Sequence, residues 1–238
     1  MNIALFGGTF DPIHTGHLRV AKAAAGRFGL DRILFVPSAH PPHKQTGQLT
    51  AFGHRFAMVA LACAADQRYL PSLLEAPTAD ERPQYSVRTV RALRRRIAPR
   101  DRLFFIIGVD AFLDLPHWQE PRALLDLADF IVVSRPGSDA GKIWSVLPPE
   151  MALPGPRART GGLTQPDTIR LRHSRLHILQ GIDMHVASRD IRDMVRAGGR
   201  ITGLVPAAVE KYIAKEGLYQ EAGRARKQYQ SGKTSSTG

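Results

Sequence analysis

The sequence predicts an α/β fold in which one parallel β-sheet is covered by helices on both faces. Short apolar runs recur along the chain, as in strands that are buried on both faces. Amphipathic helical patterns fall between these runs, and such alternation is typical of a parallel sheet whose crossover connections are helices. The chain has 238 residues, 43% of them hydrophobic, which suits one large core.

The predicted elements alternate along most of the chain and indicate a single Rossmann-like, doubly wound domain. Thr50 is a candidate N-cap for one helix and Ser86 for the next. Pro206 suits the first turn of the last helix. Strands are expected at residues 3–6, 33–36, 103–107 and 130–133 and, from a weaker pattern, at 176–179; helices are expected at 18–28, 51–65, 87–94 and 205–215.

Two stretches depart from this alternation. Residues 137–171 are rich in Pro and Gly and poor in apolar residues, so we expect a loop excursion without a core of its own. Residues 219–238 are rich in Gly, Ser, Gln and basic residues, a composition typical of a disordered tail. The domain is therefore expected to span residues 1–218.

The net charge narrows the class of partner that the protein can bind. The net charge of +12 suits nucleic acid or small polyanionic substrates. Much of it lies in an arginine cluster at residues 88–102, which we interpret as a solvated surface. The sequence shows no basic patch interleaved with aromatic residues and no helix-turn-helix or zinc motif, so no nucleic-acid partner is expected.

Targeting features favour the cytoplasm. The single cysteine, Cys63, cannot form an intrachain disulfide, and its apolar surroundings predict a small buried side chain in a reducing compartment. No apolar run approaches the roughly 20 residues that span a bilayer. The N-terminus lacks the basic region of a secretory signal. A cytoplasmic protein without membrane association is expected.

The loop after the first predicted strand has the composition of a phosphate site. It reads GGTFDPIHTGH over residues 7–17. Gly7 and Gly8 lack a Cβ, so a phosphate can approach their backbone closely. Thr9 offers a hydroxyl and a backbone N–H group. Gly16 leaves room where the next helix begins, and the free N–H groups of a helix start favour an anion.

His14 and His17 stand three residues apart at this helix start, a spacing that places both imidazoles on one side. There they can donate hydrogen bonds to phosphate oxygens and stabilise the negative charge of a transition state. A structural or metal-binding role is the alternative, although a metal site needs a third ligand and the helix shows none nearby. The segment also lacks the Gly-Lys-Ser/Thr ending of a Walker loop.

Other predicted strand ends carry groups suited to nucleotides. A proline-stiffened loop can hold Lys44 over a phosphate, with a plain surface turn as the alternative. Gly108 lets a nucleotide lie on the backbone, and Asp110 can accept a hydrogen bond from a ribose hydroxyl. Trp118 stands in a polar loop bounded by proline, where its ring can stack on a ligand or pack in the core. Arg135 suits an anion contact or an ordinary surface position.

The first loop resembles the signature of the nucleotidyltransferases with a His-x-Gly-His motif, in particular the bacterial nicotinate-nucleotide adenylyltransferases. The segments PSAHPPHK (residues 37–44), YS (85–86) and IGVDAF (107–112) are similar to the same family. The family usually shows Ile-Ser-Ser-Thr-x-Ile-Arg near residue 190. This chain keeps Ser188 and Arg192 of that motif but has Ala187 and Arg189 where Ser and Thr are usual, so the role of Arg189 is left open.

The resemblance implies an enzyme of NAD biosynthesis that transfers AMP from ATP to nicotinic acid mononucleotide, giving nicotinic acid adenine dinucleotide and pyrophosphate. Mg²⁺ is expected with ATP, held mainly by phosphates and water. The residues expected to act are His14, His17, Lys44 and Arg192 in catalysis; Gly7, Gly8, Thr9, Phe10, Gly16, Gly108, Asp110 and Ser188 at ATP; and Ser86, Trp118 and Arg135 at the mononucleotide.

Two other acceptors stay open as alternatives. Phosphopantetheine transferases resemble this chain in the first motif, but they tend to be shorter, carry Thr in the place of His14 and lack the Pro-Pro-His-Lys loop. Nicotinamide mononucleotide has an amide in place of the carboxylate of nicotinic acid mononucleotide, and the sequence slightly favours the acid. The oligomeric state is also open, so a homo-oligomer is one of the outcomes to test.

Overall fold

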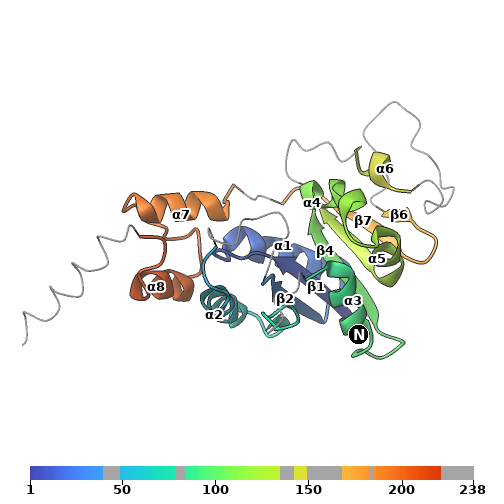
Figure 1. The fold of residues 1–238 in the computed structure, drawn as a ribbon, viewed down its shortest axis with the longest axis horizontal. Coiled ribbons are helices and arrows are strands. Elements are labelled where there is room, and N and C mark those ends of the chain that lie inside the picture. Colours follow the sequence, from blue (N-terminus) through green and yellow to red (C-terminus); the bar gives the residue numbers. More distant parts are fainter. Residues whose placement is uncertain (40–48, 79–83, 135–141, 149–167, 183–184, 221–238) are drawn as a thin grey trace, which may run out of the picture.

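A computed structural model describes residues 1–39, 49–78, 84–134, 142–148, 168–182 and 185–220 of the chain (Figure 1). Within these ranges, strands and helices alternate as expected. The strands are β1 (Asn2–Gly8), β2 (Arg32–Pro37), β3 (Tyr69–Pro71), β4 (Arg102–Gly108), β5 (Asp129–Val133), β6 (Thr168–Arg170) and β7 (Arg175–Leu179). The helices are α1 (Thr15–Phe28), α2 (Phe52–Cys63), α3 (Ser86–Arg94), α4 (Val109–Leu113), α5 (Pro121–Leu127), α6 (Ile143–Val146), α7 (Ser188–Arg196) and α8 (Ala207–Lys215).

The strands of the described residues form one seven-stranded sheet with the order β3-β2-β1-β4-β5-β7-β6. Neighbouring strands run parallel, except that β6 is antiparallel to β7. The chain leaves β1 towards β2 and β3 on one side and reaches β4 and β5 on the other. The strand order therefore reverses between β1 and β4, which confirms the doubly wound α/β fold.

Successive residues of the central strands are buried on opposite faces of this sheet. In β1, Ala4 belongs to the apolar cluster covered by α1, α2 and α8, and Leu5 belongs to the cluster covered by α3, α4 and α5. Phe104 and Phe105 of β4 divide in the same way. Figure 1 shows α2, α7 and α8 gathered at one end of the molecule, away from α3 and α5. Burial on both faces explains why these strands are unbroken apolar runs.

The expected strands are confirmed within β1, β2, β4, β5 and β7. The expected caps are shifted by one residue. Thr50 is not an N-cap, because Ala51 holds that position for α2. Ser86 is the first residue of α3, and Tyr85 is its N-cap. Pro206 precedes α8 directly as its N-cap.

The excursion over residues 137–171 is not loop throughout its described parts, although these build no core of their own. The short helix α6 and the edge strand β6 both come from this stretch. Ile143, Leu147, Ile169 and Leu171 are buried in the cluster that includes α3 and α5. A few apolar residues spaced along a polar stretch thus add to an existing core, although they are too few to build one.

Cys63 is buried at the end of α2, as expected, and burial raises the pKa of its thiol to about 12. The thiol is therefore protonated and unreactive at neutral pH. Among the helices of the described residues, none has the length and apolar character to cross a bilayer.

Candidate active site

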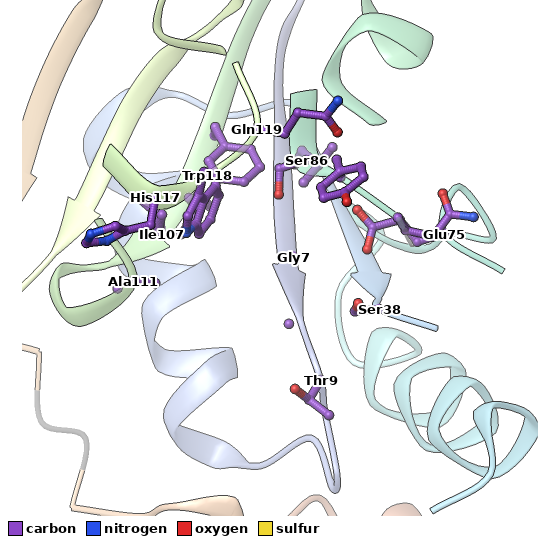
Figure 2. Close-up of a pocket in the computed structure, with 17 residues that line it drawn as sticks. Gly7, Thr9, Ser38, Glu75, Ser86, Ile107, Ala111, His117, Trp118 and Gln119 are labelled. Atoms are coloured by element: carbon purple, nitrogen blue, oxygen red, sulfur yellow. The ribbon is translucent and has the colours of Figure 1, made fainter. Parts of the chain in front are cut away.

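The reversal of strand order places β1 and β4 at the point where open α/β sheets bind ligands, beyond the carboxyl ends of the strands. Gly8 ends β1 and Gly108 ends β4. Between them lies a cavity of about 340 Å³ (Figure 2). Its volume falls in the range of small-molecule sites.

The cavity has an aromatic wall and a polar wall. Trp118 lies on one side of the end of β1, and Ser86 lies on the other with Glu75 (Figure 2). Trp118 also packs against the apolar cluster under α3 and α5, which is one of the two roles that the sequence left open, and stacking on a ligand stays a prediction. Arg91 of α3 binds Glu120 through two hydrogen bonds of 2.7 and 3.1 Å. This pair joins α3 to the segment that follows Trp118.

Glu75 is a cavity residue that sequence reasoning missed. Its side chain is 7% exposed and accepts a hydrogen bond of 2.7 Å from Thr89 Oγ1. Burial raises the pKa of the carboxyl group, while hydrogen bonds from Thr89 and Ser38 act against that rise. In the sequence Glu75 is one acid in a loop after a three-residue strand, and nothing there separates it from a surface acid.

His14 and His17 lie against each other at the start of α1, which confirms the expectation that they share one side. Their ring centroids are 3.8 Å apart, and the ring planes differ by 32°. The backbone N–H of His14 donates to Nδ1 of His17 over 3.2 Å. Because this Nδ1 accepts a hydrogen bond, the proton of the neutral His17 ring is on Nε2, which is then a donor.

Gly16 makes room for the ring of His14, and Gly8 makes room for the ring of Phe10, which packs beside His17. A Cβ on Gly16 would lie 2.9 Å from Nδ1 of His14, and a Cβ on Gly8 would lie 3.0 Å from the ring of Phe10. Phe10 has a φ of 49° and is 2% exposed. The centroid of its ring lies 5.0 Å from the centroid of the His17 ring. The side chain of Phe10, expected at ATP, therefore lies in the core and supports His17.

The start of α7 holds the backbone of the same loop. Ser188 Oγ donates to the carbonyl of Pro12 over 3.0 Å, and Arg192 Nη1 donates to the carbonyl of Asp11 over 2.8 Å. Both residues were expected at ATP phosphates, and the structure brings both to the histidine loop. Arg189, whose role was open, is 84% exposed and lies 3.7 Å from Asp193 in an ion pair.

Tyr219 belongs to the domain, although the sequence assigned residues 219–238 to a tail. Its hydroxyl donates to Oδ1 of Asp11 over 2.8 Å, and the N–H of Thr50 donates to Oδ2 over 3.3 Å. Burial, together with the neighbouring Asp11, raises the pKa of Tyr219, so the phenol keeps the proton that it donates. The domain therefore extends at least to residue 220.

The remaining expected residues lie in the cavity wall, on α4 or outside the described residues. Gly7, Gly8, Thr9 and Gly108 line the cavity, and an added Cβ on Gly108 would meet nothing within 4 Å. Asp110 is exposed in the first turn of α4. Lys44 and Arg135 lie outside the described residues, as do residues 221–238 of the tail. In the described part of the chain, no group of three His, Cys, Asp or Glu side chains could hold a metal ion.

A loop with paired imidazoles follows β1, and a cavity lies between the ends of β1 and β4 where the strand order reverses, an arrangement typical of nucleotide-binding α/β proteins. The model of the cytidylyltransferase-like family matches residues 5–211. A protein of Geobacter sulfurreducens named probable nicotinate-nucleotide adenylyltransferase is 37% identical over 94% of this chain and 100% of its own length. One of the same name from Solibacter usitatus is 37% identical over 92% and 100%. The chain belongs to the cytidylyltransferase-like family and, within it, to the nicotinate-nucleotide adenylyltransferases.

Solved structures support the fold. The nicotinic acid mononucleotide adenylyltransferase of Plasmodium falciparum, complexed with NaAD, has a TM-score of 0.68 at 18% identity and covers 92% of this chain and 97% of its own. The same protein complexed with APC has a TM-score of 0.67 at 17% identity. At these identities the likeness concerns the fold alone.

We expect Gly16→Ala to disrupt the histidine pair. The added methyl group would overlap the ring of His14 and force it away from His17. Losing a positioned donor lowers turnover on the order of 100-fold. The rate of nucleotidyl transfer measures this loss.

Gly26→Ala is the matched control, because it makes the same change in the same helix where an added Cβ meets nothing within 4 Å. Alanine favours a helix over glycine by about 0.5–1 kcal/mol. This variant should melt at a higher temperature and turn over normally. Equal turnover in the two variants would contradict the steric role of Gly16.

Proposed function

We propose that this protein transfers AMP from ATP to nicotinic acid mononucleotide, forming nicotinic acid adenine dinucleotide and pyrophosphate as a step of NAD biosynthesis. One observation carries the proposal: Gly7, Gly8 and Thr9, which lead into the segment with the paired rings of His14 and His17, line the cavity between Trp118 and Ser86. A mononucleotide with an aromatic ring and a triphosphate therefore meet at one sheet edge. The activity named for relatives at 37% identity supports it.

The reaction is an in-line displacement at the α-phosphorus of ATP. An oxygen of the mononucleotide 5′-phosphate forms a bond to this phosphorus as the bond to the bridging oxygen of pyrophosphate breaks. A phosphate dianion is already nucleophilic near neutral pH, so no general base is required. Catalysis then consists of positioning and charge stabilisation, as in phosphoryl transfer generally.

The residues around the histidine loop supply the field for this displacement. The Nε2–H of His17 and the ring of His14 donate to phosphate oxygens. Arg192 uses one N–H on the carbonyl of Asp11 and keeps others for phosphate. Lys44 adds a further positive charge, and Mg²⁺ enters with ATP as part of the substrate. ATP binds at Gly7, Gly8, Thr9, Gly16, Gly108, Asp110, Ser188 and the backbone of Phe10.

The mononucleotide ring stacks on Trp118, and its carboxylate meets the start of α3 at Ser86. The first N–H groups of a helix lack intrahelical partners and favour an anion. The first turn of α3 has no acidic residue. This environment favours the carboxylate of the acid over a neutral amide. Arg135, outside the described residues, is a further candidate for an anion contact with the mononucleotide.

We further propose that the enzyme acts in the cytoplasm, where its single buried thiol stays reduced. Residues 1–220 form the catalytic unit. No nucleic-acid partner is needed, because several arginines of the basic cluster have partners within the fold. Arg91 binds Glu120, and Arg102 binds Asp129.

An acceptor assay tests the function directly. The protein is incubated with ATP and Mg²⁺, and nicotinic acid mononucleotide, nicotinamide mononucleotide or phosphopantetheine is added separately. Pyrophosphate release should be fastest with the acid mononucleotide, and reactions without an acceptor should stay at the background rate. Faster release with either rival acceptor would overturn the assignment.

We expect His17→Ala to lower turnover by about 100-fold or more, because it removes a transition-state donor. Steady-state pyrophosphate release measures the effect. His173→Ala is the control, since His173 is exposed between β6 and β7, at the far edge of the sheet from β2 and β3. Near-normal turnover of His17→Ala would defeat the role assigned to this ring.

We expect Trp118→Ala to raise the KM for the mononucleotide by about 10-fold, within the range for loss of a stacked ring, and to leave the KM for ATP unchanged. Trp118→Phe keeps a ring and should retain most of the affinity. The two KM values are obtained by varying one substrate at saturation of the other. An equal rise in both would refute stacking.

A further inference from the structure

Arg55, near the start of α2, is a charged side chain buried completely under the phosphate-binding loops. It is 1% exposed, and by volume it is the largest of the fully buried residues in the described part of the chain. Burying a guanidinium group is costly unless its donors and its charge are satisfied. The position of Arg55 therefore requires an explanation.

The guanidinium group binds three separate segments through their backbone carbonyls. Nη1 donates to Thr9 and to Ser38, each over 2.8 Å, and Nε donates to Thr50 over 2.8 Å. Thr9 directly follows β1, and Ser38 directly follows β2. The side chain thus joins the two loops that leave neighbouring strands.

The charge of Arg55 is balanced within the same network. Burial lowers the pKa of Arg55, and the attraction of Asp11 raises it. Asp11 itself accepts hydrogen bonds from Thr50 and Tyr219. An arginine stays protonated in such surroundings because its ordinary pKa is far above neutrality.

The direction of the bound carbonyl groups determines which way the neighbouring backbone N–H groups point. A trans peptide plane holds a carbonyl and the following N–H on opposite sides. When Arg55 binds the carbonyl of Thr9, the N–H of Phe10 faces away from Arg55, and the same holds for Ser38 and the N–H of Ala39. Thr9 and Ser38 also line the cavity (Figure 2).

The two loops are also joined to each other. The N–H of Ser38 donates to the carbonyl of Gly8 over 2.9 Å. This bond and the two bonds from Arg55 Nη1 fix the spacing between the loops on the protein side of the site. Lysine could supply the charge here, but it lacks the planar fork that reaches three carbonyls at once.

We propose that Arg55 is a positioning residue for adenylyl transfer, whose guanidinium group holds Thr9 after β1 and Ser38 after β2 at the spacing that the reacting phosphates require. It acts through the backbone of Thr9 and Ser38 and touches neither substrate. The inference rests on the proposed function for its effect on turnover, and on the geometry alone for its effect on the loops.

The test compares Arg55→Lys with Arg68→Lys. Arg68 makes an ion pair with Asp66 in which the Arg68 side chain is 40% exposed, so this control makes the same chemical change outside the core. Arg55→Lys should lower kcat on the order of 100-fold, as a misplacement of reacting groups does. MgATP affinity, measured by calorimetry, should weaken by about 10-fold because the donors lose their alignment. Arg68→Lys should match the unsubstituted protein in both.

Two further readouts separate positioning from a general loss of structure. Hydrogen exchange should accelerate at the amides of residues 8–10 and 38–39 of Arg55→Lys and stay unchanged in α3 and β4. In Arg55→Ala, added guanidinium ion should restore part of the turnover, and ammonium ion at equal ionic strength should not.

Unchanged loop exchange together with unchanged MgATP affinity in folded Arg55→Lys would overturn the proposal. So would a loss of turnover that follows the folded fraction alone. Hydrogen exchange and the calorimetric MgATP affinity do not depend on the acceptor. They would therefore still test the role of Arg55 if the acceptor assay failed.

Discussion

The site depends on a close fit between aromatic rings and glycine backbone in the loop after β1. Gly8 leaves room for the ring of Phe10, and Gly16 leaves room for the ring of His14. Phe10 in turn packs against His17, which packs against His14. Each ring is placed by a neighbour that has no freedom to move away, because interiors are packed at the density of crystals. The two imidazoles are therefore held in position before any substrate arrives.

Distant parts of the chain hold this loop in its place. Arg55, Arg192 and Tyr219 bind it across sequence separations of 46, 181 and 208 residues, respectively. The first two donate to carbonyls, and Tyr219 donates to the carboxylate of Asp11. The loop conformation is thus local in origin, but its orientation towards the cavity is tertiary. Such a site forms only when α2, α7 and the segment after α8 are all in place.

The sequence predicted the features that have a repeating or local pattern. The central strands were predictable because burial on both faces makes them continuous apolar runs. The histidine pair was predictable because spacing fixes the side of a helix. Arg55 and Glu75 were not, because their partners are backbone carbonyls and hydroxyl groups, which leave no pattern in the sequence. Strands β3 and β6 have three residues each, too few to show alternation. The prediction of Thr50 as an N-cap is wrong. Its backbone N–H donates to Asp11, and its carbonyl accepts from Arg55.

The contacts of α7 explain how this chain accommodates its departure from the usual family motif. Ala187 and Arg189 stand where Ser and Thr are usual, so the hydroxyl groups of those two positions are missing. Arg189 does not replace them on the histidine loop, because it is 84% exposed and pairs with Asp193 of the same helix. Ser188 and Arg192, which the chain keeps, bind backbone carbonyls of that loop. A helix anchored through two carbonyls keeps its position when neighbouring side chains change, so the part of the motif that sets the geometry is the part retained.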